Sequence, residues 1–345
     1  MMQNVSAAFH VTGALKNPHI QSILSSSAWR KHLGLKRLQS LPASSQEQLL
    51  TLPDGTRLSG VHYATQAANA SGILVLLLHG WEGSAQSSYI NHSAAELLAA
   101  GFDVFALNFR DHGQTHDLNE GLFHSCRLQE VVDATLQIVQ GYQPKRFFVA
   151  GFSLGGNIAL KAAGELGEDA IGLFAGICAI SPSIDLHASV ESLARGINKI
   201  YEMHFLRGLA SKIRHKSVLF PERFDVEKLK LVKTIKDFDD IFTAPDGGYG
   251  DADNYYTQAS AINLIPNIRV PTLIISSKDD PIVPFESFLS DKLKTPFVTL
   301  LAPDWGGHSG FLHAHSEATG RDVSDKFWAE HRVVAFCLCK NSEGA

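Results

Sequence analysis

The chain has 345 residues, which is long enough for two domains or for one large α/β domain with an insertion. Its 45% hydrophobic and 19% charged residues are ordinary for a globular protein and exclude a globally disordered chain. The net charge of -5 gives no overall sign of nucleic-acid binding, and the 4 cysteines, none in a CxxC pair, are too few for a disulfide scaffold. We therefore expect reduced thiols and a cytoplasmic protein, with no signal peptide and no membrane-spanning run.

The first half of the chain shows regular alternation of strand and helix patterns. Asn17 and Pro18 indicate the start of a short helix in a basic, Ser-rich segment, and two strands are expected around the turn Pro53-Asp54-Gly55. From residue 73 onward, apolar strand patterns alternate with helical patterns, which predicts a parallel sheet with helices on both faces. The predicted strands are Ile73–Leu78, Phe102–Phe109, Arg146–Ala150 and one within Ile171–Ile180, and the predicted helices are Ser88–Ala100, Leu128–Gln140 and Leu154–Leu166.

The alternation stops near Pro182, and no strong strand signal follows until Pro271. Strands then resume at Thr272–Ser276 and Phe297–Leu301, with a short helix expected near Phe285–Lys294 and a last helix over Asp322–Cys337. The sequence therefore predicts a mostly parallel α/β core interrupted by a helical lid. The expected boundaries are 1–45 for an N-terminal segment that packs on the core or the lid, 46–184 and 266–345 for the core, and 185–265 for the lid.

The pentapeptide Gly151-Phe152-Ser153-Leu154-Gly155 fits the pattern G-x-S-x-G. It follows a predicted strand and opens a predicted helix, which is the context of a nucleophile elbow. Glycines are needed in this turn because side chains there would collide with neighbouring backbone. The turn holds the serine hydroxyl beyond the sheet edge, at the positive end of a helix. We therefore interpret Ser153 as a catalytic nucleophile.

A serine nucleophile needs a histidine base and an acid that orients the base. In this kind of sheet the acid follows the serine in the chain and precedes the histidine. Asp279 and Asp280 follow one of the late predicted strands, and His308 follows the next. All three lie beyond carboxyl ends of strands, where α/β sheets collect catalytic groups. Two glycines before His308 let its loop turn toward Ser153, and either aspartate can serve as the acid on this reasoning.

The oxyanion of the tetrahedral intermediate needs two hydrogen-bond donors. One is expected to be the backbone N–H of Leu154, the residue after the nucleophile. The other is expected from the loop after the strand at 73–78, where the backbone N–H of Trp81 has the right place. His79 in the same loop is interpreted as a packing side chain rather than a catalytic one.

Together these motifs resemble the α/β-hydrolase superfamily and, within it, the YheT-like family of esterases. The resemblance implies a Ser-His-Asp hydrolase with an inserted lid and no cofactor, acting on short- to medium-chain acyl esters or on glycerolipid esters. It also favours Asp280 as the acid, because Pro284 stands four residues after it, as in many relatives of this fold. The resemblance covers nearly the whole chain and rests on Asn17–Leu24, HGWEGS at 79–84, Ser88-Tyr89-Ile90, Leu107–Arg110, AGFSLGGNIALK at 150–161, DFDDIFTAP at 237–245, Asn254-Tyr255-Tyr256, SSKDDP at 276–281 and GGHSGFL at 306–312.

Two segments depart from the pattern of that family. Arg110 is followed by Asp111, where the family has glycine, and residues 115–123 differ from the family's usual stretch. Both lie near the predicted mouth of the site. They therefore leave the substrate preference open more than the chemistry.

Histidine-rich and acidic stretches suggest other functions, which the residues favour less. His112 and His116 stand four apart in the chain, but Gly113 between them argues against a helix. His313 and His315 lie near the predicted base, and no HExxH or CxxC pattern accompanies any of them, so we predict no metal site. The aspartates at 237–253 lack the register of a calcium-binding loop, and no phosphate-binding motif is present, so we predict no cofactor.

Basic residues are concentrated in two stretches. Residues 1–45 contain five Lys or Arg and no acidic residue, and residues 195–236 contain eleven Lys or Arg and four acidic residues. A solvated helical face explains these charges. Attraction to an anionic membrane surface or to a phosphorylated lipid is the alternative explanation. We expect a small-molecule ester or lipid substrate and no nucleic acid as partners, and the oligomeric state stays open.

The sequence thus predicts a serine carboxylesterase or lipase-like hydrolase that works through an acyl-enzyme intermediate. A thioesterase or amidase of the same fold is the alternative among enzymes. A non-catalytic binding protein that keeps the fold is the alternative outside them. The intact set of serine, aspartate and histidine favours the enzyme.

Overall fold

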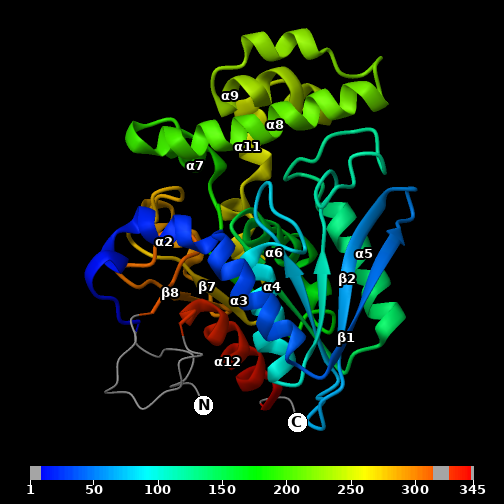
Figure 1. Ribbon diagram of the computed structural model, residues 1–345, viewed down its shortest axis with the longest axis vertical. Helices are drawn as coiled ribbons and strands as arrows, with labels where there is room; N and C mark the ends of the chain where they lie inside the picture. The colour runs from blue at the N-terminus through cyan, green and yellow to red at the C-terminus, as the bar shows by residue number, and fades with distance from the viewer. Residues whose placement is uncertain (1–8, 314–325, 343–345) are drawn as a thin grey trace.

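The computed structural model describes residues 9–313 and 326–342. Its centre is an 8-stranded sheet with the strand order β1-β2-β4-β3-β5-β6-β7-β8 (Figure 1). β1 pairs antiparallel with β2 and β2 pairs antiparallel with β4, whereas the remaining neighbours are parallel, as predicted. The strands span Ala43–Thr51 (β1), Arg57–Thr65 (β2), Ile73–Leu78 (β3), Asp103–Leu107 (β4), Arg146–Phe152 (β5), Gly176–Ile180 (β6), Thr272–Ile275 (β7) and Val298–Leu301 (β8).

β3 shows why the middle of the sheet requires an unbroken apolar run. All six of its residues are buried. Ile73, Val75 and Leu77 pack in the apolar cluster on one face of the sheet. The alternate residues at 74, 76 and 78 pack in the cluster on the opposite face. Since successive side chains of a strand point to opposite sides, a strand covered on both faces has no polar position.

Helices cover both faces of the sheet. α4 and α12 pack on one face, with α3 lying against α4, and α5 and α6 pack on the other. Gly34 lies inside α3, where a Cβ would come within 3.0 Å of the backbone nitrogen of His92, so the glycine allows α3 and α4 to approach closely. These helices span Pro18–Ser25 (α2), Ala28–Gln39 (α3), Ser88–Ala99 (α4), Leu128–Tyr142 (α5), Leu154–Leu166 (α6) and Trp328–Ser342 (α12).

Between β6 and β7 the chain forms a group of helices that lies over one end of the sheet (Figure 1). The longest of them, α8, has 21 residues. Two small apolar clusters hold this part together, one of which also includes Leu122 from the loop before α5. Within the described residues, no helix has the length and apolar character needed to cross a membrane. The elements are Leu186–Leu193 (α7), Gly196–Asn198 (η3), Lys199–Leu219 (α8), Val226–Leu231 (η4), Ile235–Phe238 (α9), the π-helical turn Asp239–Thr243 (η5), Ala244–Gly247 (α10) and Ala252–Ala259 (α11).

Two late elements differ from the prediction. Residues 285–294 form two 3₁₀ helices rather than one helix, because Ser290 between them is extended, with φ -63° and ψ 137°. The last helix begins later than predicted because Phe327, just before it, is paired with Leu312 in an isolated β-bridge. Residues 322–325 of the predicted helix lie outside the described residues.

Candidate active site

Ser153 occupies a sharp turn between β5 and α6. Its φ of 51° and ψ of -117° are strained for a residue with a side chain. A Cβ on Gly151 would lie 2.3 Å from the carbonyl oxygen of Gly155, and a Cβ on Gly155 would lie 2.4 Å from that of Leu78, so this turn requires both glycines. The serine is held at the N-terminus of α6, where the helix dipole favours negative charge.

The side chains of Ser153, His308 and Asp280 form a continuous hydrogen-bonded chain. Nε2 of His308 lies 2.9 Å from Oγ of Ser153, and Nδ1 of His308 lies 2.8 Å from Oδ2 of Asp280. Oδ1 of the buried Asp280 carboxylate accepts hydrogen bonds from the backbone N–H groups of Ile282 at 2.8 Å and Val283 at 3.0 Å. These bonds fix the carboxylate in the orientation that faces the imidazole.

The side chain of Asp279 points away from the hydrogen bonds that join Ser153, His308 and Asp280. Its Oδ1 accepts a hydrogen bond from the backbone N–H of Gly307 at 2.9 Å, and burial raises the pKa of its carboxyl group. By holding Gly307 it shapes the turn before His308. Of the two candidate acids, the structure brings Asp280 to the histidine and gives Asp279 a role in the loop.

The backbone groups expected to bind the oxyanion lie beside Ser153. Leu154 is the first residue of α6, so its N–H has no acceptor within the helix. The loop that carries Trp81 forms a turn in which the N–H of Gly83 donates to the carbonyl of Gly80 at 3.0 Å. A Cβ on Gly80 would lie 3.2 Å from Cβ of Ser153. The loop backbone therefore runs directly against the serine side chain.

His79 packs the base of the same loop. Burial lowers its pKa to about 4, so the ring is neutral at pH 7. Nε2 accepts a hydrogen bond from the backbone N–H of Phe109 at 3.2 Å, which leaves Nδ1 to donate to the carbonyl of Gly80 at 2.7 Å. With both nitrogens engaged, His79 ties the loop to the end of the neighbouring strand.

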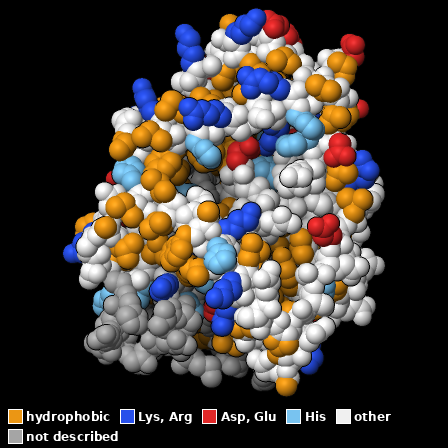
Figure 2. All heavy atoms as spheres, viewed as in Figure 1, with side chains coloured by type: hydrophobic (Ala, Val, Ile, Leu, Met, Phe, Trp, Pro, Cys, Tyr) orange, Lys and Arg blue, Asp and Glu red, His pale blue; other side chains and the backbone are white. Residues whose placement is uncertain are grey.

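Ser153 and His308 open into a cavity of about 520 Å³. This volume falls within the range of small-molecule sites. Its wall is mostly apolar and comes from the core and from the helices between β6 and β7, with α7 and α8 contributing Leu186, Val190, Leu193, Tyr201, Phe205 and Leu209. At its rim Ile23, Ile197 and Ile200 are each 60% exposed. Figure 2 shows Lys and Arg side chains among apolar ones over the same helices.

Comparison with known proteins shows the family of this chain. Residues 73–314 match the family described as the alpha/beta hydrolase fold. The chain belongs to this family. It is 28% identical to YheT of Escherichia coli (strain K12), over 95% of this chain and 92% of that protein. It is 27% identical to phospholipase ABHD3 of Mus musculus, over 79% of this chain and 67% of that protein.

Two further likenesses concern a lipase and a solved structure. The chain is 27% identical to monoacylglycerol lipase of Saccharomyces cerevisiae (strain ATCC 204508 / S288c), over 76% of this chain and 58% of that protein. The Pyrococcus furiosus esterase Pf2001 has a similar fold, with a TM-score of 0.57 at 19% identity over 89% of this chain and 93% of that one.

In this α/β hydrolase, the N-terminal helix α2 supports the loop that carries His308. The backbone N–H of His308 donates to Oγ of Ser22 at 2.8 Å. Gln21 brackets Leu312, since its Oε1 accepts from the N–H of that residue at 2.8 Å and its Nε2 donates to the carbonyl at 3.1 Å. The partners of Ser22 and Gln21 stand 286 and 291 residues further along the chain, so local sequence patterns do not predict these contacts.

The neighbouring helix α3 is fastened to the same region. Arg30 is fully buried, pairs with the buried Glu330 of α12 and donates to the carbonyl of Ser309 at 3.1 Å. Burial lowers the pKa of Arg30 to about 9, so the guanidinium is still charged at pH 7. A Cβ on Gly307 would lie 2.3 Å from the carbonyl oxygen of Pro18, so the glycine lets the histidine loop pass against α2.

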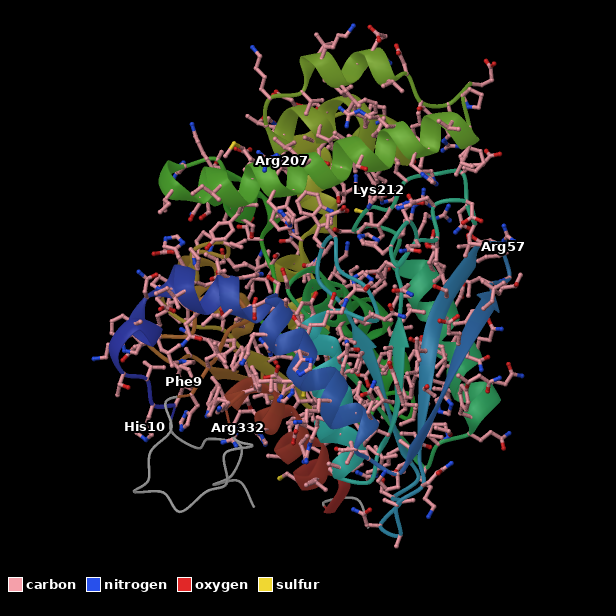
Figure 3. The ribbon with its side chains drawn as sticks, viewed as in Figure 1. Phe9, His10, Arg57, Arg207, Lys212 and Arg332 are labelled. Atoms are coloured by element: carbon pink, nitrogen blue, oxygen red, sulfur yellow. The ribbon has the colours of Figure 1, made fainter. Side chains whose placement is uncertain are left out.

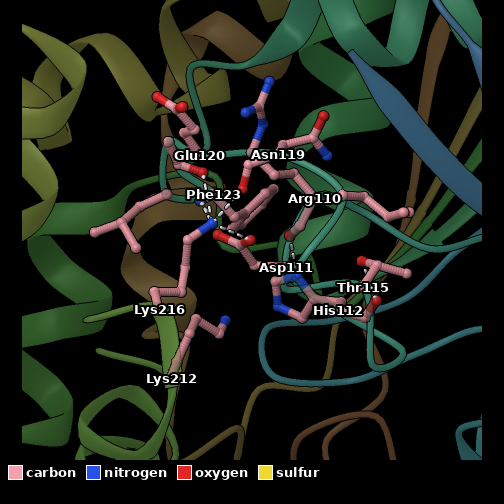
Figure 4. Close-up of polar contacts among 12 residues, drawn as sticks. Arg110, Asp111, His112, Thr115, Asn119, Glu120, Phe123, Lys212 and Lys216 are labelled. Atoms are coloured by element: carbon pink, nitrogen blue, oxygen red, sulfur yellow. Dashed lines mark hydrogen bonds and ion pairs between the residues drawn. The ribbon is translucent and has the colours of Figure 1, made fainter. Parts of the chain in front are cut away.

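A buried ion pair joins the loop at 110–123 to α8 (Figure 4). Nζ of Lys216 lies 2.8 Å from Oδ1 of Asp111, and neither side chain is exposed. The same ammonium donates to the carbonyls of Asn119 at 2.6 Å and Gly121 at 3.3 Å. Burial raises the pKa of Asp111 and lowers that of Lys216, and each partner opposes the shift of the other. The departure from the family pattern at Asp111 therefore creates a contact between this loop and α8.

A second ion pair joins α8 to the loop that carries Trp81. Nζ of Lys212 lies 2.6 Å from Oε1 of Glu82, the residue after Trp81, which has a left-handed φ of 55°. Nε2 of the buried His112 lies 3.6 Å from the same oxygen. Burial holds the pKa of His112 well below its usual range, so the imidazole is neutral. Figure 3 shows Lys212 on α8, with Arg207 further toward the start of that helix.

The histidines and aspartates that suggested metal sites have other contacts. In the part of the chain that the structure describes, no group of three or more His, Cys, Asp or Glu is arranged to hold a metal ion. The ring of His116 lies 5.2 Å from that of His215, and His315 lies outside the described residues. In the acidic stretch at 237–253, Asp237 forms a capping box with Thr234.

Proposed function

We propose that this α/β hydrolase is a serine hydrolase that cleaves carboxylic esters through an acyl-enzyme intermediate. The observation that carries the proposal is the hydrogen-bonded chain from Ser153 through His308 to Asp280. Its place at a strained turn between β5 and α6 adds support, because that turn exposes the serine hydroxyl. The names of its relatives, a phospholipase and a monoacylglycerol lipase, favour ester bonds over other acyl substrates.

In this mechanism His308 acts first as the base. Its Nε2 accepts the hydroxyl proton while Oγ of Ser153 attacks the ester carbonyl carbon. Asp280 holds the tautomer of the imidazole and stabilises the imidazolium. The backbone N–H groups of Trp81 and Leu154 donate to the oxyanion. His308 then protonates the leaving alcohol, and water activated by the same histidine attacks the acyl-enzyme and restores Ser153.

The helices at 185–265 act as a lid that shapes an acyl pocket in this proposal. Support comes from α7 and α8, which contribute much of the apolar wall of the cavity. A cavity of about 520 Å³ favours short- to medium-chain acyl groups. We also propose a cytoplasmic location. The reduced thiols of Cys178 and Cys337, both buried in the core, are in keeping with it.

Labelling by a fluorophosphonate and hydrolysis of p-nitrophenyl esters from acetate to palmitate test the function. We expect the wild type to be labelled and to turn over, and Ser153→Ala to lose labelling and about a millionfold in kcat. Ser217→Ala on α8 is the matched control, because the hydroxyl of Ser217 donates within the helix, to the carbonyl of Arg214 at 2.9 Å. Labelling without ester turnover would point to a thioesterase or amidase. No labelling of a folded protein would favour a binding protein.

A further inference from the structure

The cavity wall contains a buried carboxylate with no counter-charge, that of Asp239. Of the described residues that line the cavity, three are Asp, Glu, Lys or Arg. Two of them, Glu82 and Lys212, pair with each other at 2.6 Å. Asp239 is only 5% exposed and takes part in none of the ion pairs of the described residues. Lys236, the cation that most favours its charge, pairs with Asp253 at 2.6 Å.

Hydroxyl groups gather around this carboxylate. The hydroxyl of Tyr256 donates to Oδ2 of Asp239 at 2.7 Å, and Thr243 ends the π-helical turn that Asp239 begins. Next to them, the hydroxyl of Tyr255 hydrogen-bonds Ser125 at 3.3 Å. All five residues line the same cavity as the proposed nucleophile. They make one polar corner in a wall that is otherwise mostly apolar.

The charge of this corner is costly to bury. Burial raises the pKa of Asp239 to about 6, although Thr243 and Tyr256 favour the charged form. At pH 7 the group is therefore mostly ionised, and a buried carboxylate without a cation is destabilising unless hydrogen bonds satisfy it. A π-helical turn in a cavity wall is a further sign of a ligand contact, because such turns occur frequently at functional sites.

We propose that Asp239, with Tyr256 and Thr243, binds a hydroxyl group of the substrate, so that the enzyme prefers esters that bear a free hydroxyl group in the alcohol or in the acyl chain. This inference rests on the ester hydrolysis proposed above. A substrate hydroxyl can donate to the carboxylate, which has lone pairs beyond the one that accepts from Tyr256. The hydrogen bond to Asp239 is charge-assisted and hence strong. An ester without the hydroxyl leaves the carboxylate without that partner.

The test compares kcat/KM on esters with an eight-carbon acyl chain. Ethyl octanoate has no hydroxyl, 1-mono-octanoylglycerol has hydroxyls in the alcohol, and ethyl 8-hydroxyoctanoate has one in the acyl chain. We expect one of the two hydroxyl-bearing esters to be favoured over ethyl octanoate. Asp239→Asn should lower that ratio about tenfold or more, since it removes the charge at constant size. A purely structural role of Asp239 would lower all three values together and leave the ratio unchanged.

Asp240→Asn is the matched control. Asp240 stands beside Asp239 in the same turn, but its Oδ1 accepts from the backbone N–H of Ala252 at 2.7 Å and it does not line the cavity. We expect the ratio to stay at the wild-type value. The inference is wrong if Asp239→Asn leaves both hydroxyl ratios unchanged. It is also wrong if the favoured substrate is octanoylcholine and Asp239→Asn removes that preference, because the site would then bind a cation.

A binding measurement separates this inference from the proposed chemistry. Wild type and Asp239→Asn are titrated with 1-O-octylglycerol and 8-ethoxyoctanol, and with ethyl octyl ether as the hydroxyl-free control. Fluorescence of Trp81, which lines the cavity, reports binding. We expect the variant to bind one hydroxyl-bearing ether about tenfold more weakly and the control ether equally well. If the variant binds the hydroxyl-bearing ether more weakly but the wild type turns over no ester, only the proposed hydrolysis is refuted. If the wild type turns over esters but the variant binds that ether as well as the wild type does, only the inference about Asp239 is refuted.

Discussion

Removing one partner of the buried pair between Asp111 and Lys216 should destabilise the protein strongly. In Lys216→Met the carboxylate of Asp111 keeps one donor, the backbone N–H of Phe123 at 3.0 Å. The carbonyls of Asn119 and Gly121 lose the ammonium that lies 2.6 Å and 3.3 Å away. An uncompensated buried charge costs about 3–5 kcal/mol. We expect a loss of about 4 kcal/mol in the free energy of unfolding at pH 7.

The two single variants should respond to pH in opposite directions. Burial already raises the pKa of Asp111, and Lys216 opposes this, so Lys216→Met raises it further. A carboxyl group whose pKa is higher in the folded state loses stability as pH rises, so this variant is less destabilised at pH 5 than at pH 8. In Asp111→Asn the pKa of Lys216, already lowered by burial, falls further. A lysine with a lower pKa in the folded state gains stability as pH rises, so this variant recovers toward pH 9.

These changes in stability are measured by urea unfolding between pH 5 and pH 9. The proteins compared are the wild type, both single variants and the double variant. The double variant Asp111→Asn with Lys216→Met removes both charges, and we expect it to be more stable than either single variant. The reasoning fails if Lys216→Met costs less than about 1 kcal/mol, the value of an exposed pair. It fails equally if the two single variants show the same pH slope.

Three further outcomes are expected. Gln21→Ala removes the side chain that bonds the N–H and the carbonyl of Leu312. It should lower the free energy of unfolding, measured with urea, by about 2 kcal/mol and lower kcat with little change in KM. A stability loss with unchanged kcat would contradict this. Lys212→Met removes the ion pair with Glu82 and so frees the loop around Trp81, which should lower kcat on p-nitrophenyl octanoate about tenfold. Lys212→Arg should restore part of the loss. Equal kcat in the wild type and both variants would count against this role of Lys212. If the cavity rim contacts a membrane, Ile200→Ser should weaken binding to phosphatidylglycerol vesicles about tenfold. Leu231→Ser, similarly exposed but away from the rim, should not weaken it, and equal effects of the two changes would refute the contact.

The central sheet could be predicted from sequence because its signals are local. The apolar run of β3 and the turn around Ser153 each follow from a few adjacent residues. The loops that carry His308 and the pair Asp279-Asp280 could be predicted for a related reason, since each follows a strand of that sheet, whereas the choice of Asp280 came from the family resemblance.

Contacts between distant segments could not be predicted in this way. Gln21 meets Leu312 across 291 residues, and Lys216 reaches Asp111 across 105. In the local sequence, Gln21 and Lys216 resemble ordinary polar residues on exposed helix faces. The acidic stretch at 237–253 did not single out Asp239 either, because only the packing of η5 against the cavity distinguishes it from its neighbour Asp240.

The partnership of α2 and α3 with the histidine loop has a consequence for how the chain folds. Arg30 meets Glu330 across 300 residues of the chain, and Ser22 meets His308 across 286. Closing a loop of this length is entropically costly and slows folding. The sheet can therefore form before α2 and α3 dock, while the imidazole is positioned only when they do. A refolding chain should regain its secondary structure before its activity. The interval between the two measures how slowly α2 and α3 dock.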